Sequence, residues 1–166
     1  MRRAVVITVV AAASGVAWGA SATGPVRTVP CSEVIDHPRF PYRSDGYRPV
    51  LGAFSVPPAY LRQVTHVGGN WPYWRKTGLV IRAGAPAATV TVPRAWRSRA
   101  AIIWGNAGRP ASSLRFARCA GRAREGRAYA GGFYLRARSA CVPLVFRVGS
   151  RLATVRFGVG RRCQGR

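Results

Sequence analysis

The chain has 166 residues, 48% of them hydrophobic and 19% charged, which is enough for the core of one domain and too short for two. Its 27 Lys and Arg residues face only four Asp and Glu residues, so the formal net charge is +23. Such a field attracts polyanions: nucleic acid, anionic lipid or acidic wall polymers. Codon bias in a GC-rich genome explains why Lys76 is the single lysine, but it does not explain the shortage of acids.

The N-terminus has the pattern of a secretory signal peptide. Residues 1–3 carry two arginines, residues 4–13 are apolar, and Ala20–Ala22 forms a small-x-small cleavage site. Ser14 and Gly19 interrupt the apolar run before it reaches the roughly 20 residues that a membrane span needs. We therefore expect residues 1–22 to be removed and the mature protein to be secreted, with no transmembrane anchor. Its 25 basic and four acidic residues give the mature chain a net charge of +21.

Four cysteines remain after cleavage: Cys31, Cys119, Cys141 and Cys163. An even number in an exported protein predicts two disulfides, and the spacings fit no zinc motif. Three pairings are possible. We favour Cys31 with Cys163, because chain termini often lie close together, and Cys119 with Cys141. The pairing of Cys31 with Cys119 and of Cys141 with Cys163 is the alternative that we weigh against it.

The mature chain divides into an extended lead-in, residues 23–47, and a β domain, residues 48–166. Short apolar segments between turn signals predict strands at 48–56, 61–66, 77–83, 87–92, 100–104, 113–119, 129–136, 141–148 and 152–159. Segments 77–83 and 87–92 are expected to form a hairpin. The last three segments are expected to form a β-meander, with apolar and polar residues alternating in its final two strands, as in a sheet that covers a core.

These elements predict an all-β fold: a disulfide-stapled β-sandwich, immunoglobulin-like or jelly-roll in style, with about seven to nine short antiparallel strands. Its core is expected to contain Phe54, Leu79, Ile81, Val90, Val92, Ile103, Leu114, Phe116, Phe133, Leu135, Leu144, Phe146, Val155 and Phe157. Trp104, at the end of an apolar strand, is also expected in the core. Gly131 and Gly132 interrupt a strand, which indicates a bulge or the close approach of another backbone.

The stretch WPYWRK is the most binding-like part of the sequence. We interpret it as a loop in which aromatic faces stack on sugars or bases and cations hold anionic groups. The candidate ligand-binding residues are Trp71, Tyr73, Trp74, Arg75 and Lys76. The competing interpretation is that the two tryptophans are core aromatics at one end of the sandwich, with Arg75 stacked against them.

Catalytic and metal-binding patterns are weak. Asp36, His37 and His66 are the residues from which a metal site or a triad would have to be built, but no G-x-S-x-G is present and all four cysteines are better explained as bridges. Adjacent Asp36 and His37 project to opposite sides of an extended segment. A pair of carboxylates for sugar hydrolysis is a further option, although ion pairing with arginine is the more natural role for the acids. We expect no catalytic residues, no metal and no cofactor.

Several segments together resemble a group of uncharacterised small secreted proteins of high-GC Gram-positive bacteria. They are GLVIRAG, VTVPRAWR, AAIIWGN, LRFARC, AYAGGFYL, ACVPL and TVRFGVGRRC, and they extend over roughly residues 48–163. The resemblance implies export, a compact β domain and paired cysteines. It implies no catalytic residues.

The function predicted from the sequence is a secreted, non-catalytic binding or structural module of the cell envelope or extracellular space. Its expected partner is an anionic cell-surface polymer or polysaccharide, with non-specific polyanion binding in addition. Two alternatives stay open. One is a secreted hydrolase of wall or extracellular polymers, which would need His37 or His66 in a cleft with an acid. The other is a cationic effector that binds nucleic acid or membranes.

Overall fold

The structure is a computed structural model that describes residues 26–105 and 108–164. The predicted signal peptide, residues 1–22, lies outside the described residues. The described chain forms fourteen strands and three short 3-10 helices, η1 (Cys31–Glu33), η2 (Ser44–Gly46) and η3 (Arg94–Trp96). The predicted all-β, disulfide-stapled sandwich is confirmed. The strands are more numerous than predicted because many contain only two to four residues.

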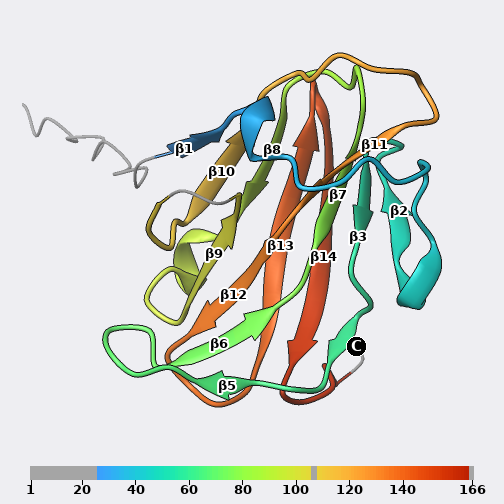
Figure 1. The fold of residues 1–166 in the computed structure, drawn as a ribbon. Coiled ribbons are helices and arrows are strands. Elements are labelled where there is room, and N and C mark those ends of the chain that lie inside the picture. The colour runs from blue at the N-terminus through green and yellow to red at the C-terminus, as the bar shows by residue number, and fades with distance from the viewer. Residues whose placement is uncertain (1–25, 106–107, 165–166) are drawn as a thin grey trace, which may run out of the picture.

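One layer of the sandwich is a six-stranded sheet (Figure 1). In spatial order its strands are β1 (Val26–Val29), β10 (Ser113–Phe116), β8 (Ala88–Thr91), β13 (Ala140–Val148), β14 (Arg151–Val159) and β4 (Tyr60–Leu61). The two edge strands, β1 and β4, pair in parallel with their neighbours, so the sheet is mixed and not purely antiparallel as predicted. Because β1 comes from the predicted lead-in, residues before 48 also contribute to this sheet.

The other layer consists of two four-stranded sheets. One has the order β11 (Gly126–Tyr129), β7 (Leu79–Arg82), β3 (Phe54–Val56), β2 (Arg48–Val50), and the other β5 (Thr65–His66), β6 (Tyr73–Lys76), β12 (Gly131–Leu135), β9 (Ala100–Trp104). Strands β6 and β7 follow each other along the chain, as do β11 and β12. Lys76 pairs with Gly132, and Leu79 pairs with Tyr129, so both strand pairs share one register, with no insertion on either side. The two sheets are therefore halves of one bent layer.

The bend lies at Thr77 and Gly78, opposite Ala130. Backbone groups that leave a buried ladder need other partners, and two side chains supply them here. The Tyr47 hydroxyl lies 3.1 Å from both the amide nitrogen and the carbonyl oxygen of Gly78, and it can accept from the first and donate to the second. Trp104 Nε1–H donates to the Thr77 carbonyl at 3.1 Å. The bent backbone is thus held by side chains from η2–β2 and β9.

Aromatic rings from both layers meet in the core. Phe54 of β3 lies 5.0 Å from Phe146 of β13, and Phe133 of β12 lies 5.4 Å from Phe157 of β14. Trp104, predicted in the core, is 1% exposed and contacts Phe133 edge-to-face. These ring pairs contribute stacking energy beyond the burial of their apolar area. They join the six-stranded sheet to the bent layer and so make the sandwich a single core.

The predicted core is confirmed except at Ile103, which is half exposed. Its neighbours Ile102 and Trp104 face the core instead, so the alternation of β9 is shifted by one residue. The predicted close approach at the paired glycines is confirmed: a Cβ at Gly131 would lie 2.0 Å from the Ile103 carbonyl oxygen, and one at Gly132 would lie 1.9 Å from that of Arg75.

Several predicted strand pairings are wrong. The expected hairpin of 77–83 with 87–92 does not form, because β7 and β8 lie in different layers. The expected meander is also wrong, since β12 pairs with β6 and β9 and only β13 and β14 form a hairpin. In both cases a short connection carries the chain from one layer to the other. Segment 48–56 is not one strand but a hairpin, because Leu51 and Gly52 have positive φ and reverse the chain.

The disulfides join Cys31 to Cys119 and Cys141 to Cys163, so the favoured pairing is wrong and the alternative is confirmed. The first bridge follows from the parallel pairing of β1 with β10, which sets both cysteines just beyond neighbouring strand ends. The second forms because the chain turns back after β14. A Cβ at Gly158, opposite Cys141, would lie 3.0 Å from the Cys163 amide nitrogen. Two disulfides indicate an oxidising compartment. Within residues 26–105 and 108–164, no helix has the length and apolar character needed to cross a membrane.

Replacing Tyr47 with Phe tests whether the hydrogen bonds of its hydroxyl stabilise the bend. We expect Tyr47→Phe to lower the free energy of unfolding by about 1–3 kcal/mol, because the Gly78 amide and carbonyl lose their shared partner. Denaturant titration measures the change. Tyr134→Phe, which removes a hydroxyl from the outer side of β12, is the matched control and should change stability by less than about 0.5 kcal/mol. Equal effects of both substitutions would contradict this role.

Disulfide removal tests the connectivity. In the loop-entropy description, opening the 88-residue separation of Cys31–Cys119 costs about 4.5 kcal/mol, and opening the 22-residue separation of Cys141–Cys163 costs about 3.5 kcal/mol. Paired Cys→Ser variants should lose stability in that order in denaturant titrations. Peptide mapping without reduction should link the same cysteines, and a peptide that joins Cys31 to Cys163 would show that the pairing is wrong.

Candidate functional site

The predicted binding stretch is only partly a loop. Trp71 precedes β6, and the following residues from Tyr73 to Lys76 form this strand, so their side chains alternate between two faces. Tyr73 and Arg75 pair with Leu135 and Phe133, both fully buried, and therefore face the core. Trp74 and Lys76 face outward. The five candidate residues are thus divided between the inside and the outside of the layer.

Arg75 has an unusual environment for a cation. It pairs with Phe133, and its Nε is buried without a hydrogen-bond partner among the described residues. The Arg75 side chain is half-buried, a common arrangement for arginine, whose aliphatic stem can cover apolar surface while its charged group stays in water. Tyr73 packs against the core, with its ring 5.4 Å from that of His66. These two side chains support the strand from within.

The outward side chains form what we call the outer aromatic face: Trp71, Trp74, Lys76, Tyr134 and Arg136. Trp74 and Tyr134 are cross-strand partners with ring centroids 4.4 Å apart. The Arg136 guanidinium carbon lies 4.8 Å from the centre of the Trp71 ring, in cation–π geometry. The three aromatic residues are half exposed. The sequence interpretation missed Tyr134 and Arg136, although their alternation with buried Phe133 and Leu135 was a usable signal.

A pocket of about 440 Å³ has walls from the segment that precedes β5 and from the segments that follow β12 and β14. Its lining residues are Arg62, Gln63, Val64, Arg138, Ser139 and Gly160. Two of them are cationic and none is acidic, so the lining of this pocket is positively charged.

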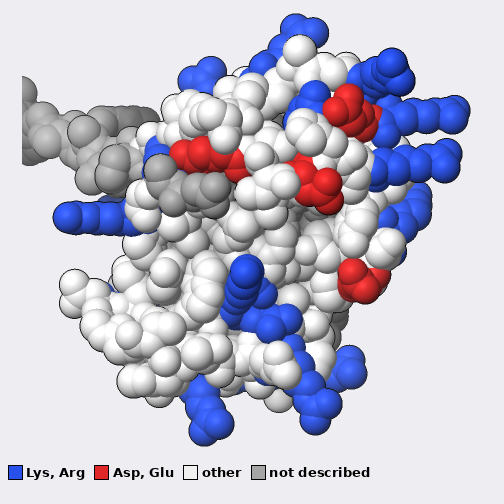
Figure 2. Space-filling model, in the orientation of Figure 1, with Lys and Arg blue, Asp and Glu red and all other residues white. Residues whose placement is uncertain are grey.

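The four acids occupy a restricted part of the molecule. Glu33, Asp36 and Asp45 belong to the segment before β2, and Glu125 pairs across an isolated bridge with Arg39 of the same segment. In Figure 2 the acidic side chains lie in the upper part and at the right of the view, while the lower edge shows only basic and uncharged residues. The outer aromatic face contains no acid, so nothing within it neutralises its cations.

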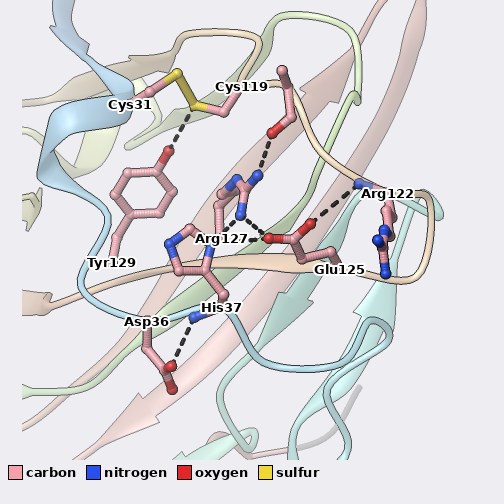
Figure 3. A network of polar contacts seen from close by, with 9 residues as sticks. Cys31, Asp36, His37, Cys119, Arg122, Glu125, Arg127 and Tyr129 are labelled. Atoms are coloured by element: carbon pink, nitrogen blue, oxygen red, sulfur yellow. Dashed lines mark hydrogen bonds and ion pairs between the residues drawn. A yellow bond between two sulfur atoms is a disulfide. The ribbon is translucent and has the colours of Figure 1, made fainter.

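A second polar cluster lies beside the Cys31–Cys119 bridge (Figure 3). His37 Nδ1 lies 3.1 Å from Glu125 Oε1, and the Arg127 guanidinium contacts both of them and the Ala120 carbonyl. The Arg122 amide donates to Glu125 Oε2 at 3.2 Å. The hydrogen bond from Arg127, followed by the one from the Arg122 amide, lowers the pKa of Glu125.

The same cluster borders an open pocket of about 490 Å³, lined by His37, Pro38, Arg39, Arg122, Arg124 and Glu125. His37 therefore does meet an acid, as the hydrolase alternative requires, but the acid is Glu125 and not Asp36. The Asp36 carboxylate instead accepts a hydrogen bond from the His37 amide at 2.7 Å. His66 lies on β5, in the four-stranded sheet that also contains β6, β12 and β9. No group of three or more His, Cys, Asp or Glu side chains that could hold a metal occurs in the described part of the chain.

No protein-family model, curated protein or solved structure matches the chain. The resemblance to secreted proteins of high-GC Gram-positive bacteria therefore stays a prediction, as does the immunoglobulin-like or jelly-roll style of the sandwich.

The lowered pKa of Glu125 predicts a pH dependence of stability. Its folded pKa lies below the ordinary value of 4.5, so its contribution is complete above pH 4.5 and is lost as the pH falls through the folded pKa. Glu125→Gln should lower stability at neutral pH and flatten the decline below pH 4.5. Denaturant titrations of both proteins from neutral pH to roughly pH 3 measure this difference. Parallel curves over the whole range would contradict the assignment.

Proposed function

We propose that the protein is a non-catalytic module that binds an anionic polysaccharide of the cell envelope or extracellular space through the outer aromatic face. The observation that carries the proposal is the Trp74–Tyr134 pair, which faces outward at 4.4 Å between Lys76 and Arg136. Aromatic faces pack against the apolar faces of sugar rings, and the cations attract carboxylate or phosphate substituents.

The shape of the site favours a polymer over a small molecule. Small-molecule sites are concave and bury most of their ligand. The Trp74–Tyr134 pair lies on one face of a β-sheet, and neither residue lines a described pocket. An extended chain can lie along such a surface and contact the Trp71–Arg136 pair at the end of the strands as well. The two disulfides support a location outside the reducing cytoplasm.

The contact between His37 and Glu125 does not favour the hydrolase alternative. A general base must have a pKa near the working pH and an oxygen that is available to the substrate. Glu125 has a lowered pKa, and its two oxygens already accept from Arg127 and from the Arg122 amide. No hydroxyl or thiol belongs to the described lining of this pocket, so it offers no nucleophile of the serine or cysteine type.

Binding of polygalacturonate, an anionic polysaccharide, tests the proposal. We expect Trp74→Ala to weaken binding about ten-fold, which is on the scale of the about 1–3 kcal/mol that one aromatic side chain contributes when a nucleic-acid base stacks on it. The double variant Lys76→Gln/Arg136→Gln should weaken binding and reduce its salt dependence. Isothermal titration calorimetry at two salt concentrations measures both effects.

The matched control is Arg115→Gln/Arg147→Gln, which also removes two charges. Both control residues are exposed, and they are aligned through Thr89 on the outer side of the six-stranded sheet. We expect the control to keep most of the affinity. Equal losses of affinity in the two double variants would mean that binding depends on overall charge and not on the outer aromatic face. Tighter binding of duplex DNA than of polygalacturonate at the same salt would favour the nucleic-acid effector.

A further inference from the structure

The cationic loop between Cys119 and β11 forms a second candidate site. We call the pocket lined by His37, Pro38, Arg39, Arg122, Arg124 and Glu125 the arginine pocket. None of its residues belongs to the outer aromatic face. The arginine pocket is therefore separate from the proposed polysaccharide site.

The backbone of the arginine pocket is fixed by hydrogen bonds between its two segments. Arg39 pairs with Glu125 in an isolated antiparallel bridge. The Phe40 amide donates to the Arg124 carbonyl at 2.8 Å, and the Gly126 amide donates to the Pro38 carbonyl at 2.6 Å. The Cys31–Cys119 bridge ties the loop at one end and the pairing of β11 with β7 ties it at the other. The arginines thus project from an ordered backbone and not from a loose tail.

Glu125 organises the arginine pocket without forming a side-chain ion pair with any of its three exposed arginines. Its carboxylate oxygens bind Arg127, whose side chain is 11% exposed, and the Arg122 amide. Gly121 lets this arrangement pack closely, since a Cβ there would lie 2.3 Å from the Arg127 guanidinium and 2.9 Å from Glu125 Oε2. The acid therefore acts as a structural partner of Arg127.

The remaining cations are available to a ligand. Arg39, Arg122 and Arg124 are exposed, and none forms a side-chain ion pair within residues 26–105 and 108–164. The His37 side chain is 58% exposed at the rim. Three like charges held in one pocket repel one another, and this repulsion is relieved when an anion binds between them.

We propose that the arginine pocket binds a phosphate group through the guanidinium groups of Arg39, Arg122 and Arg124. Guanidinium is planar and donates in pairs, which suits the oxygens of phosphate. A tetrahedral phosphate offers more acceptor oxygens than a planar carboxylate and so can engage three guanidinium groups together. The volume of about 490 Å³ leaves space for a substituent on the phosphate, so the source is either a small phosphate ester or the phosphate of a polymer.

Titration with inorganic phosphate tests the site on the full secreted chain. We expect Arg39→Gln/Arg124→Gln to raise the dissociation constant for inorganic phosphate about ten-fold or more, because two charge-assisted contacts are lost. The control Arg115→Gln/Arg147→Gln, with the same loss of net charge, should stay within about two-fold of the natural protein. Equal affinities of the natural protein and the Arg39/Arg124 variant would overturn the proposal.

Two further measurements make the result specific. The first is thermal unfolding in phosphate and in chloride at equal ionic strength. Phosphate should raise the melting temperature of the natural protein and not that of Arg39→Gln/Arg124→Gln. Equal melting temperatures of the two proteins in chloride would show that the variant is folded. Stabilisation by chloride equal to that by phosphate would overturn the site. Trp74→Ala should bind phosphate normally, which separates this site from the outer aromatic face.

Glycerol phosphate and dimethyl phosphate distinguish the two sources of the ligand. Preference for glycerol phosphate supports a monoester on a small molecule or a polymer end. Comparable binding of dimethyl phosphate supports a phosphodiester within a polymer. Failure of both esters, where inorganic phosphate binds, would contradict the space assigned to a substituent.

Discussion

The bend in the second layer, with its backbone held by Tyr47 and Trp104, is the constraint on which the remaining architecture depends. A buried peptide group that leaves a β-ladder must find another partner or lose about 1–3 kcal/mol. Here the Tyr47 hydroxyl contacts both polar groups of Gly78, and the Trp104 indole donates to Thr77. The layer can therefore change direction without orphaned groups at these positions. Both halves cover the core, one with β3 and β7 and the other with β6 and β12, and the outer face of the second half carries Trp74 and Tyr134.

The sequence was sufficient for the fold class and for most of the core, because alternation reports which residues of a strand face inward. The hairpin of β13 and β14 illustrates this, since its predicted core residues are all buried: Leu144, Phe146, Val155 and Phe157. Alternation does not report which strands are neighbours. The wrong meander and the wrong hairpin both arose where a short connection joins different layers, because a connection of that length is also compatible with a hairpin.

The same limitation explains the disulfides and the site. The pairing of Cys31 with Cys119 depends on β1 lying parallel to β10, a contact between distant segments that no local pattern indicates. Trp74 and Lys76 were recognised because they lie in one short stretch. Tyr134 and Arg136 were missed because they join that stretch only through strand pairing. The contact of His37 with Glu125 likewise requires residues 88 positions apart to meet.

The placement of charge links the fold to binding. The chain has 27 basic residues and only four acidic ones, so the acids are too few to pair with most of the basic residues. Glu33 pairs with Arg27 and Glu125 with Arg127, so these acids neutralise side chains that are themselves largely buried. The exposed arginines remain positively charged. Two of the four acids, Glu33 and Glu125, thus pair with largely buried arginines and not with exposed ones.

The two candidate sites lie along one continuous strand path, because β11 leads into β12 across the bend. Glu125 beside the arginine pocket and Tyr134 on the outer aromatic face are nine residues apart, and at about 3.3 Å per residue this path measures at most about 30 Å. The arginine pocket and the outer aromatic face share no residue, so a small ligand is expected to occupy one site at a time. Only an extended polymer that carries phosphate could reach both, and its two contacts would then raise the affinity through effective concentration. For that ligand alone, the losses caused by Trp74→Ala and by Arg39→Gln/Arg124→Gln would be coupled and not independent.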